Sequence, residues 1–284
     1  MIMYYAKFCN VYFTGLPVFP SSQIMLTRFI AYLFLQKFSP STIASYISAI
    51  GFGHKARMLS DPTSSFIVKK ILKGAEKLKV KVDCRLPITG EILVRLVNAI
   101  PLVISNLYFQ SLMRAMFLIA FYAFLRIGEI TVSNQKIRSK VLPISNTNFS
   151  FHCNKLFGVS LVLTQYKHSE AHPKTLSILR DEQNLYCPVM ALKSYLDLSQ
   201  HTSGPLFQFP DGDAVTHNYF SSTLRSILQF CNFDPNLYKG HSFRIGAATV
   251  AASKGIPLSV IQNMGRWKSD ALKHYIRLNN FKLS

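Results

Sequence analysis

The sequence contains one uninterrupted run of eleven apolar residues, 115–125, which is closed by Arg114 and Arg126. A helix needs about 20 such residues to cross a bilayer. The run is therefore too short for a membrane span, and it predicts a helix buried in the core of a globular protein. At 49% apolar residues in 284, the chain can build such a core. Its length fits one large domain or two unequal ones.

The first part of the chain, residues 21–81, has the pattern of a small helical bundle. Residues that favour a helix N-terminus precede three stretches with apolar side chains at helical spacing: Ser21 and Ser22, Ser39-Pro40, and Ser64 and Ser65. On the first of these helices, Ile24, Phe29 and Ile30 are expected to share the buried face. Residues 82–89 have the composition of a linker, and Pro87 disfavours helix just before it.

The second part of the chain combines helices with a short sheet. Helical patterns cover residues 91–100 and 111–125, and helices return after Cys187-Pro188. Between them lie three stretches typical of strands: 149–152, 159–164 and 175–179. We therefore predict a mainly α protein with a small antiparallel β-sheet, divided into a helical domain, 1–83, and a larger domain, 84–284.

The net charge is +19, from 32 Lys and Arg residues against 13 Asp and Glu. Residues 1–83 carry +8 of this excess and the remainder carries +11, so the charge is not confined to a tail. A folded chain with such an excess favours a polyanionic partner. A distributed excess indicates a broad binding surface, so nucleic acid is favoured over a peripheral basic arm, and double-stranded DNA is the expected partner.

Lysines are concentrated on the third predicted helix of the bundle, at Lys69, Lys70, Lys73 and Lys77. Lysines opposite an apolar stripe usually form only a solvated surface. In a chain this basic, contact with the phosphate backbone of DNA is at least as good an interpretation.

Cysteine and histidine spacing gives no sign of a metal site. The five cysteines lie far apart without a CxxC pair, which fits reduced structural thiols in an intracellular protein. His168 and His172 are four residues apart, but no third ligand is near them.

The C-terminal part has an unusual order of polar groups: His241 and Arg244 three residues apart, then the only tryptophan, Trp267, then Tyr275. His241 and Arg244 lie one helical turn apart and can reach the same site. Trp267 alone would be a core aromatic, but its indole N–H is also a donor suited to a phosphate oxygen. Tyr275 is a possible nucleophile if cations and a histidine base offset the reluctance of a phenol to ionise.

Two further residues complete the groups needed to break a phosphodiester without metal. Arg126 can direct a rigid fork of donors at phosphate, although alone its pairing with Glu129 three residues later is the commoner interpretation. Lys167, expected at a hairpin tip, can protonate a departing 5′ oxygen or can simply be solvated.

The ordered set of Arg126, Lys167, His241-x-x-Arg244, Trp267 and Tyr275 resembles the tyrosine recombinases, the phage integrase family. The stretches Gly265-Arg-Trp267 and Tyr275-Ile-Arg277 are most similar to the recombinases of eukaryotic mobile elements of the crypton and DIRS kind. The resemblance covers nearly the whole chain: residues 21–81 are similar to the helical core-binding domain, and residues 88–284 to the catalytic domain.

The resemblance implies that Arg126 and Arg244 hold the scissile phosphate, that Trp267 donates to it, and that Glu129 helps to order the pocket. It also implies that the two domains form a clamp around DNA, that a homotetramer with a dimer at each site exchanges strands, and that neither metal nor ATP nor another cofactor is needed. For an element of eukaryotes it implies a nuclear protein.

The bond-breaking roles implied by the resemblance fall to Tyr275, Lys167 and His241. Tyr275 forms a 3′-phosphotyrosine, Lys167 is the general acid, and His241 assists proton transfer. Bacterial members usually have histidine where Trp267 stands, nine rather than eight residues before the tyrosine. The nine residues after Tyr275 predict little exchange of a C-terminal helix between subunits.

Two alternatives to a recombinase remain open from the sequence. A type IB topoisomerase uses nearly the same catalytic groups, although the bundle-and-linker arrangement favours a recombinase. A domesticated, catalytically silent DNA-binding protein would keep the fold, but the complete set of catalytic residues speaks against it.

Overall fold

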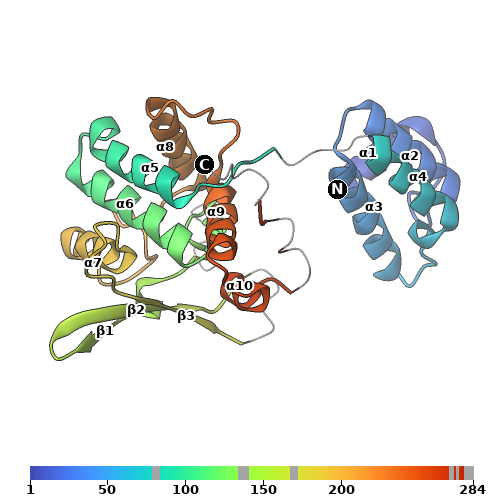
Figure 1. The fold of residues 1–284 in the computed structure, drawn as a ribbon. Coiled ribbons are helices and arrows are strands. Elements are labelled where there is room, and N and C mark those ends of the chain that lie inside the picture. The colour runs from blue at the N-terminus through green and yellow to red at the C-terminus, as the bar shows by residue number, and fades with distance from the viewer. Residues whose placement is uncertain (79–83, 134–140, 167–171, 269–271, 273–274, 278–284) are drawn as a thin grey trace. The chain divides into compact units, whose positions relative to one another are not determined.

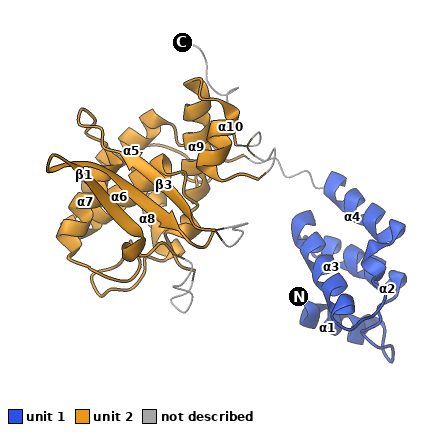
Figure 2. Cartoon of the chain, turned by 90° about the horizontal axis from the view of Figure 1, so that it is seen from below, with its two compact units in different colours: residues 1–83 blue, residues 84–284 orange. Residues whose placement is uncertain are grey.

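The computed structural model describes residues 1–78, 84–133, 141–166, 172–268, 272 and 275–277. The chain divides into two compact units, Met1–Asp83 and Cys84–Ser284, which are coloured separately in Figure 2. Each unit has its own hydrophobic core. No helix in the described part of the chain is long and apolar enough to span a membrane.

The described part of unit 1 is a bundle of α-helices. They are α1 (Ile2–Tyr12), α2 (Gln23–Leu35), α3 (Pro40–Lys55) and α4 (Phe66–Leu78). The hydroxyls of Ser22 and Ser39 accept N–H groups in the first turns of α2 and α3, which confirms both predicted starts. One predicted core residue is wrong: Ile24 is 62% exposed, because α2 turns the face of Met25, Phe29 and Leu33 toward the core.

The described part of unit 2 combines helices with one sheet, as Figure 1 shows. The helices are α5 (Gly90–Val103), α6 (Leu107–Tyr122), α7 (Pro188–Ser199), α8 (His217–Phe230), α9 (Gly240–Ser253) and α10 (Leu258–Gly265). The strands are β1 (Thr147–His152), β2 (Lys155–Leu163) and β3 (Lys174–Leu179), paired antiparallel in that order. This arrangement confirms the predicted fold class of a mainly α protein with a small antiparallel sheet.

The long apolar run forms the second half of α6 and the turn that follows it. Its side chains are buried except for Tyr122, as expected for a helix in the core. The helix ends at Tyr122, and Phe124 then adopts a left-handed conformation with φ of 51°. This turn redirects the chain, so that Arg126 begins a short 3₁₀ helix, Ile127–Glu129, instead of extending α6.

The segment from Cys84 to Thr89 is not a free linker, which corrects the interpretation of residues 82–89 in this part. Leu86 donates its N–H to Leu237 O at 2.8 Å, and Ile88 donates to Ser242 O at 3.0 Å. The Ile88 side chain is fully buried in the core of unit 2. Residues 79–83 lie outside the described part of the chain.

Gly246 allows α9 to approach this segment. A β-carbon at Gly246 would lie 1.7 Å from the carbonyl oxygen of Ile88, which no rearrangement of a side chain can relieve. The backbone contact therefore depends on glycine in the middle of a helix, where alanine is otherwise preferred.

We expect Gly246→Ala to lower the free energy of unfolding of unit 2 by more than about 2 kcal/mol, because the overpacked segment must move. Gly90→Ala is the matched control, since its β-carbon meets nothing within 4 Å. The control should change stability by less than about 1 kcal/mol. Urea unfolding followed by the fluorescence of Trp267 measures both, and equal effects would contradict the role of this contact.

Candidate active site

The carboxylate of Glu129 organises two arginines. Its Oε2 accepts the backbone N–H of Arg126 at 2.9 Å and Nη2 of Arg266 at 2.7 Å. Its Oε1 accepts Nη1 of Arg126 at 3.1 Å. Glu129 and Arg266 are buried, whereas Arg126 is partly exposed. The ion pair between Arg126 and Glu129 that the sequence suggested is therefore present, and it leaves the exposed part of Arg126 at the surface of the site.

The start of α9 brings Arg244 to the same place. A β-carbon at Gly240 would lie 2.3 Å from Ile127 Cγ1, so glycine allows α9 to begin directly against the Arg126 turn. Arg244 is fully buried and donates from Nη1 to Phe124 O and from Nη2 to Gly265 O. Its guanidinium lies over the Trp267 ring, 4.1 Å from the centroid. The contacts of Arg244 are thus with the protein, and its contact with phosphate stays a prediction.

The Gly265-Arg-Trp267 stretch ends α10 in a tight turn. Arg266 is left-handed, with φ of 57°, and the N–H groups of Arg266 and Trp267 bond back to Asn263 and Gln262. The indole folds over Gly265, where a β-carbon would lie 1.5 Å from Trp267 Cζ3. Glycine at this position therefore fixes where the tryptophan ring can lie.

Tyr275 lies between His241 and Trp267. Its hydroxyl is 2.9 Å from His241 Nε2, and its ring centroid is 4.9 Å from that of Trp267. The backbone around it is held by Thr249 of α9, whose hydroxyl is 3.2 Å from both Tyr275 O and Arg277 N. The tyrosine hydroxyl is thus placed against a histidine nitrogen that can accept its proton.

Positive charge exceeds negative charge at this centre. Among the described residues, the three arginines Arg126, Arg244 and Arg266 face one carboxylate, that of Glu129. Burial, followed by the charges of Arg126 and Arg266, lowers the pKa of Arg244 to about 9. Burial also lowers the pKa of Arg266, although Glu129 opposes this effect. Arg244 binds its proton more weakly in the folded than in the unfolded protein. Below about pH 9, where Arg244 is charged in both states, its charge therefore lowers the free energy of unfolding, and an anion beside Arg244 would reduce that loss.

Buried donors at the site lack acceptors. Within the described part of the chain, four such donors have no hydrogen-bond partner: Trp267 Nε1, Arg244 Nε, and Nε and Nη1 of Arg266. Buried N–H groups are almost always paired in folded proteins. A group with several acceptor oxygens would satisfy such donors, as the oxygens of a phosphate do.

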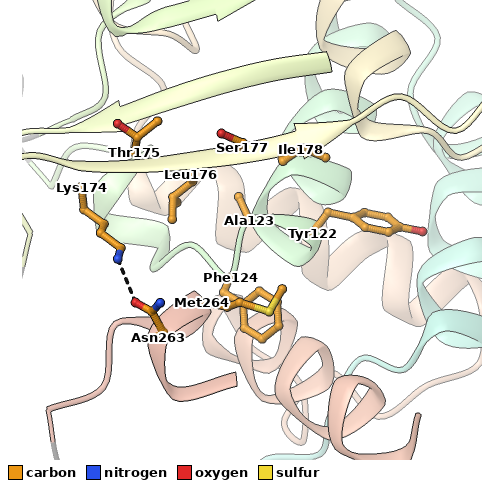
Figure 3. A pocket seen from close by; sticks show the side chains of 10 residues that line it. All are labelled: Tyr122, Ala123, Phe124, Lys174, Thr175, Leu176, Ser177, Ile178, Asn263 and Met264. Carbon is orange, nitrogen blue, oxygen red and sulfur yellow. Dashed lines mark hydrogen bonds between the residues drawn. The ribbon is translucent and has the colours of Figure 1, made fainter. Parts of the chain in front are cut away.

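The sheet is tied to α10 beside this centre. A pocket of about 190 Å³ lies between β3 and α10. Figure 3 shows Phe124 and Met264 on one side of it and Leu176 on the other. At its mouth Lys174 donates to Asn263 Oδ1 at 2.8 Å. Since Asn263 O also accepts the N–H of Arg266 at 3.1 Å, this bond links the sheet to the turn that carries Arg266.

The structure brings most of the predicted site residues together. They are Arg126, Glu129, His241, Arg244, Trp267 and Tyr275. Lys167 lies outside the described residues. The lysines predicted to bind DNA, Lys69, Lys70, Lys73 and Lys77, are exposed on α4 of the other unit.

Sequence reasoning missed two residues of the site. Arg266 was treated only as the middle of a motif, although an arginine between glycine and a lone tryptophan was a signal for a buried cation. Thr249 was missed because nothing in the sequence showed that its hydroxyl would hold the Tyr275 segment.

The arrangement of helices and sheet is shared with solved structures of DNA recombinases. The XerH site-specific recombinase bound to palindromic difH substrate aligns with a TM-score of 0.61, over 94% of this chain and 72% of that chain, at 15% identity. The chain has the fold of the tyrosine recombinases. A lambda integrase dimer bound to a COC′ core site aligns with a TM-score of 0.60, at 13% identity, over 99% of this chain and 90% of that chain.

Sequence comparison adds one relative. An integrase/recombinase xerD homolog of Selenomonas ruminantium is 29% identical over 151 residues, which are 50% of this chain and 43% of that protein. The chain therefore spans less than half the length of this curated relative. No protein-family model matches the sequence. At identities this low the solved structures establish the fold, and the activity has to be argued from the site.

We expect Gly265→Ala to displace the indole from α10, and with it the stacking partner of Arg244. The emission of Trp267, the only tryptophan, should shift to longer wavelength as the ring reaches water, and stability should fall by roughly 1–3 kcal/mol. Gly128→Ala is the control, because its β-carbon meets nothing within 4 Å. An unchanged emission spectrum in Gly265→Ala would show that the ring is not held in this way.

Proposed function

We propose that this chain breaks and rejoins DNA strands, with Tyr275 as the nucleophile. The observation that carries the proposal is the 2.9 Å approach of the Tyr275 hydroxyl to His241 Nε2, beside three arginines and a buried indole donor. The similar structures of recombinases and integrases described as bound to DNA support DNA as the partner. The net charge of +19 supports the same partner.

In the proposed reaction the Tyr275 oxygen attacks the scissile phosphorus while its proton passes to His241 Nε2. The bond between phosphorus and the 5′ oxygen breaks, and the 5′ oxygen leaves as a hydroxyl after it takes a proton, for which Lys167 is the proposed donor. The product is a 3′-phosphotyrosine with a free 5′-hydroxyl. Attack by a 5′-hydroxyl on the adduct reverses each transfer, so religation consumes no external energy source.

The charge at the site fits this chemistry. A pentavalent phosphorane carries more negative charge on its non-bridging oxygens than the diester does. Arg126 presents a partly exposed guanidinium that Glu129 holds in place, and the indole N–H of Trp267 has no acceptor among the described residues. Fixed donors aimed at developing charge lower the barrier because they need no reorganisation during the reaction.

Three finer proposals rest on the family resemblance. We propose that copies act as dimers at each DNA site and pair into a tetramer, and the similar lambda integrase is described as a dimer on a core site. We propose that the chain belongs to a mobile element of the crypton or DIRS kind, on the basis of Gly265-Arg-Trp267 and Tyr275-Ile-Arg277. A nuclear location would follow from that origin.

One observation favours a second candidate, a catalytically silent DNA-binding protein. Both terminal nitrogens of Arg244 already donate to main-chain carbonyls, so this arginine serves the fold as it stands. The same protein would still bind DNA through its positive charge. The two candidates differ in whether a covalent adduct forms.

Covalent adduct formation tests the nucleophile. Nicked duplexes that lose the cleaved fragment, with randomised flanking sequence, should trap the protein on DNA as a band that survives denaturing electrophoresis. Tyr275→Phe should abolish the band, because the ring remains but the attacking oxygen is gone. Tyr186→Phe is the matched control, since its hydroxyl bonds to Asn98 Oδ1 elsewhere on unit 2. A band retained in Tyr275→Phe would exclude this nucleophile, and no band in any protein would favour the silent binder.

Salt dependence of DNA binding tests the lysines of α4. Each lysine that neutralises a backbone phosphate contributes about 0.9 to the slope of log K against log salt concentration. Lys73→Gln combined with Lys77→Gln should therefore reduce the slope by nearly two. The control pair, Lys7→Gln with Lys37→Gln, removes the same charge from exposed lysines on other parts of unit 1. An equal reduction of the slope in both double variants would mean that the lysines of α4 contact DNA phosphates no more than other exposed lysines do.

A further inference from the structure

We propose that Arg266 anchors a binding site for a backbone phosphodiester of DNA, in a pocket between α10 and β3. The pocket has a volume of about 300 Å³, and its lining includes Arg266, Trp267, Lys174 and Tyr166. The inference deepens the proposed function and rests on it for the identity of the ligand as DNA. The anion site itself is argued from the side chains alone.

The first argument is the unfinished hydrogen bonding of Arg266. The residue is only 8% exposed, and its Nη2 is used by Glu129 Oε2 and Phe124 O. Its Nε and Nη1 have no hydrogen-bond partner among the residues that the structure describes. A purely structural arginine at this depth would be expected to satisfy all of its donors, because each unmade bond to a charged group costs free energy. The two unpaired donors belong to a residue that lines the pocket.

The second argument is charge. Three cationic side chains, Lys174, Arg266 and Lys268, line the pocket, and its described lining includes no carboxylate. Glu129 forms an ion pair with Arg266, but the same carboxylate also pairs with Arg126. One negative charge is therefore shared by two arginines, and the pocket keeps a positive excess that suits a phosphodiester.

The third argument is that the guanidinium is fixed in advance. The left-handed backbone at Arg266 and the bond of its N–H to Asn263 O set the start of the side chain. The bond to Glu129 sets the far end, and the Tyr166 ring lies 6.0 Å from the guanidinium carbon. Trp267 also lines the pocket, and its indole N–H finds no acceptor in the described part of the chain. A preorganised cation binds an anion with little further loss of side-chain entropy.

Trp267 lines this pocket and also touches Tyr275, so the bound phosphate is near the proposed nucleophile. It is therefore either the phosphate that Tyr275 attacks or an adjacent one on the same strand. Both are phosphodiesters of the DNA backbone and would be recognised by the same donors.

Inorganic sulfate tests the anion site without DNA. Sulfate should raise the thermal stability of the full chain in a saturable way. Arg266→Met should weaken the apparent sulfate affinity by about tenfold or more, as expected for losing hydrogen bonds to a charged group. Arg225→Met is the control, because Arg225 is an exposed arginine on α8 of the same unit. Unchanged sulfate affinity in Arg266→Met, or no stabilisation of the unaltered chain by sulfate, would overturn the proposal.

Lys174→Met provides a second variant that does not depend on the buried pair with Glu129. It should weaken sulfate binding by about threefold, because Lys174 is a partly exposed cation in the lining of the pocket. If Arg266→Met does not fold, this variant decides, and an unchanged affinity would overturn the proposal. Sulfate affinity reports on the anion site, whereas the covalent band reports on Tyr275, so failure of the anion site and failure of the nucleophile give different results.

Methylphosphonate linkages distinguish the two phosphates once a cleaved sequence has been selected. A methylphosphonate removes the charge of one non-bridging oxygen. Placed at the phosphate that Arg266 contacts, it should abolish the difference in DNA affinity between Arg266→Met and the unaltered chain. Loss of the difference at the scissile linkage identifies that phosphate, and loss at the neighbouring linkage identifies the adjacent one. A defect that persists at every position would show that Arg266 acts only on the fold.

Discussion

The carboxylate of Glu129 is the interaction on which the rest of the site depends. It joins Arg126, from the turn after α6, to Arg266, from the turn after α10. Arg244 of α9 shares the carbonyl of Phe124 with Arg266, so two buried cations and the partly exposed Arg126 meet at one carboxylate. Without the carboxylate these charges would repel one another in a medium of low polarity, where such repulsion is strong. The remaining positive excess is what makes the centre receptive to phosphate.

Glycines set how closely the elements of this centre approach one another. The lack of a β-carbon at Gly240 lets Ile127 pack against the start of α9. In the same way Gly246 lets the backbone of Ile88 approach α9, and Gly265 leaves room for the Trp267 ring. A side chain at any of these positions would separate elements that must be in contact for the arginines to share acceptors. Close packing of the backbone at these glycines therefore determines where the functional side chains lie.

Much of the fold followed from local patterns. The serine caps of α2 and α3 and the apolar run of α6 were predictable, because capping and burial are decided within a few residues. The exposure of Ile24 was not predictable, since α2 is almost wholly apolar and its sequence does not show which face is buried. The anchoring of Ile88 was missed because its partner, Ser242, is distant in sequence.

The sequence by itself determined the chemical groups of the site: a histidine and an arginine one turn apart on α9, a lone indole and a tyrosine eight residues beyond it. Which of those groups touch follows from the packing of distant segments. This packing buried Arg244 completely, paired Tyr275 with His241, and brought Arg266 to the carboxylate of Glu129, 137 residues away in the chain. The physical reason is that residue type and local spacing fix chemistry and helix face, whereas contact between distant segments depends on how closely whole helices pack.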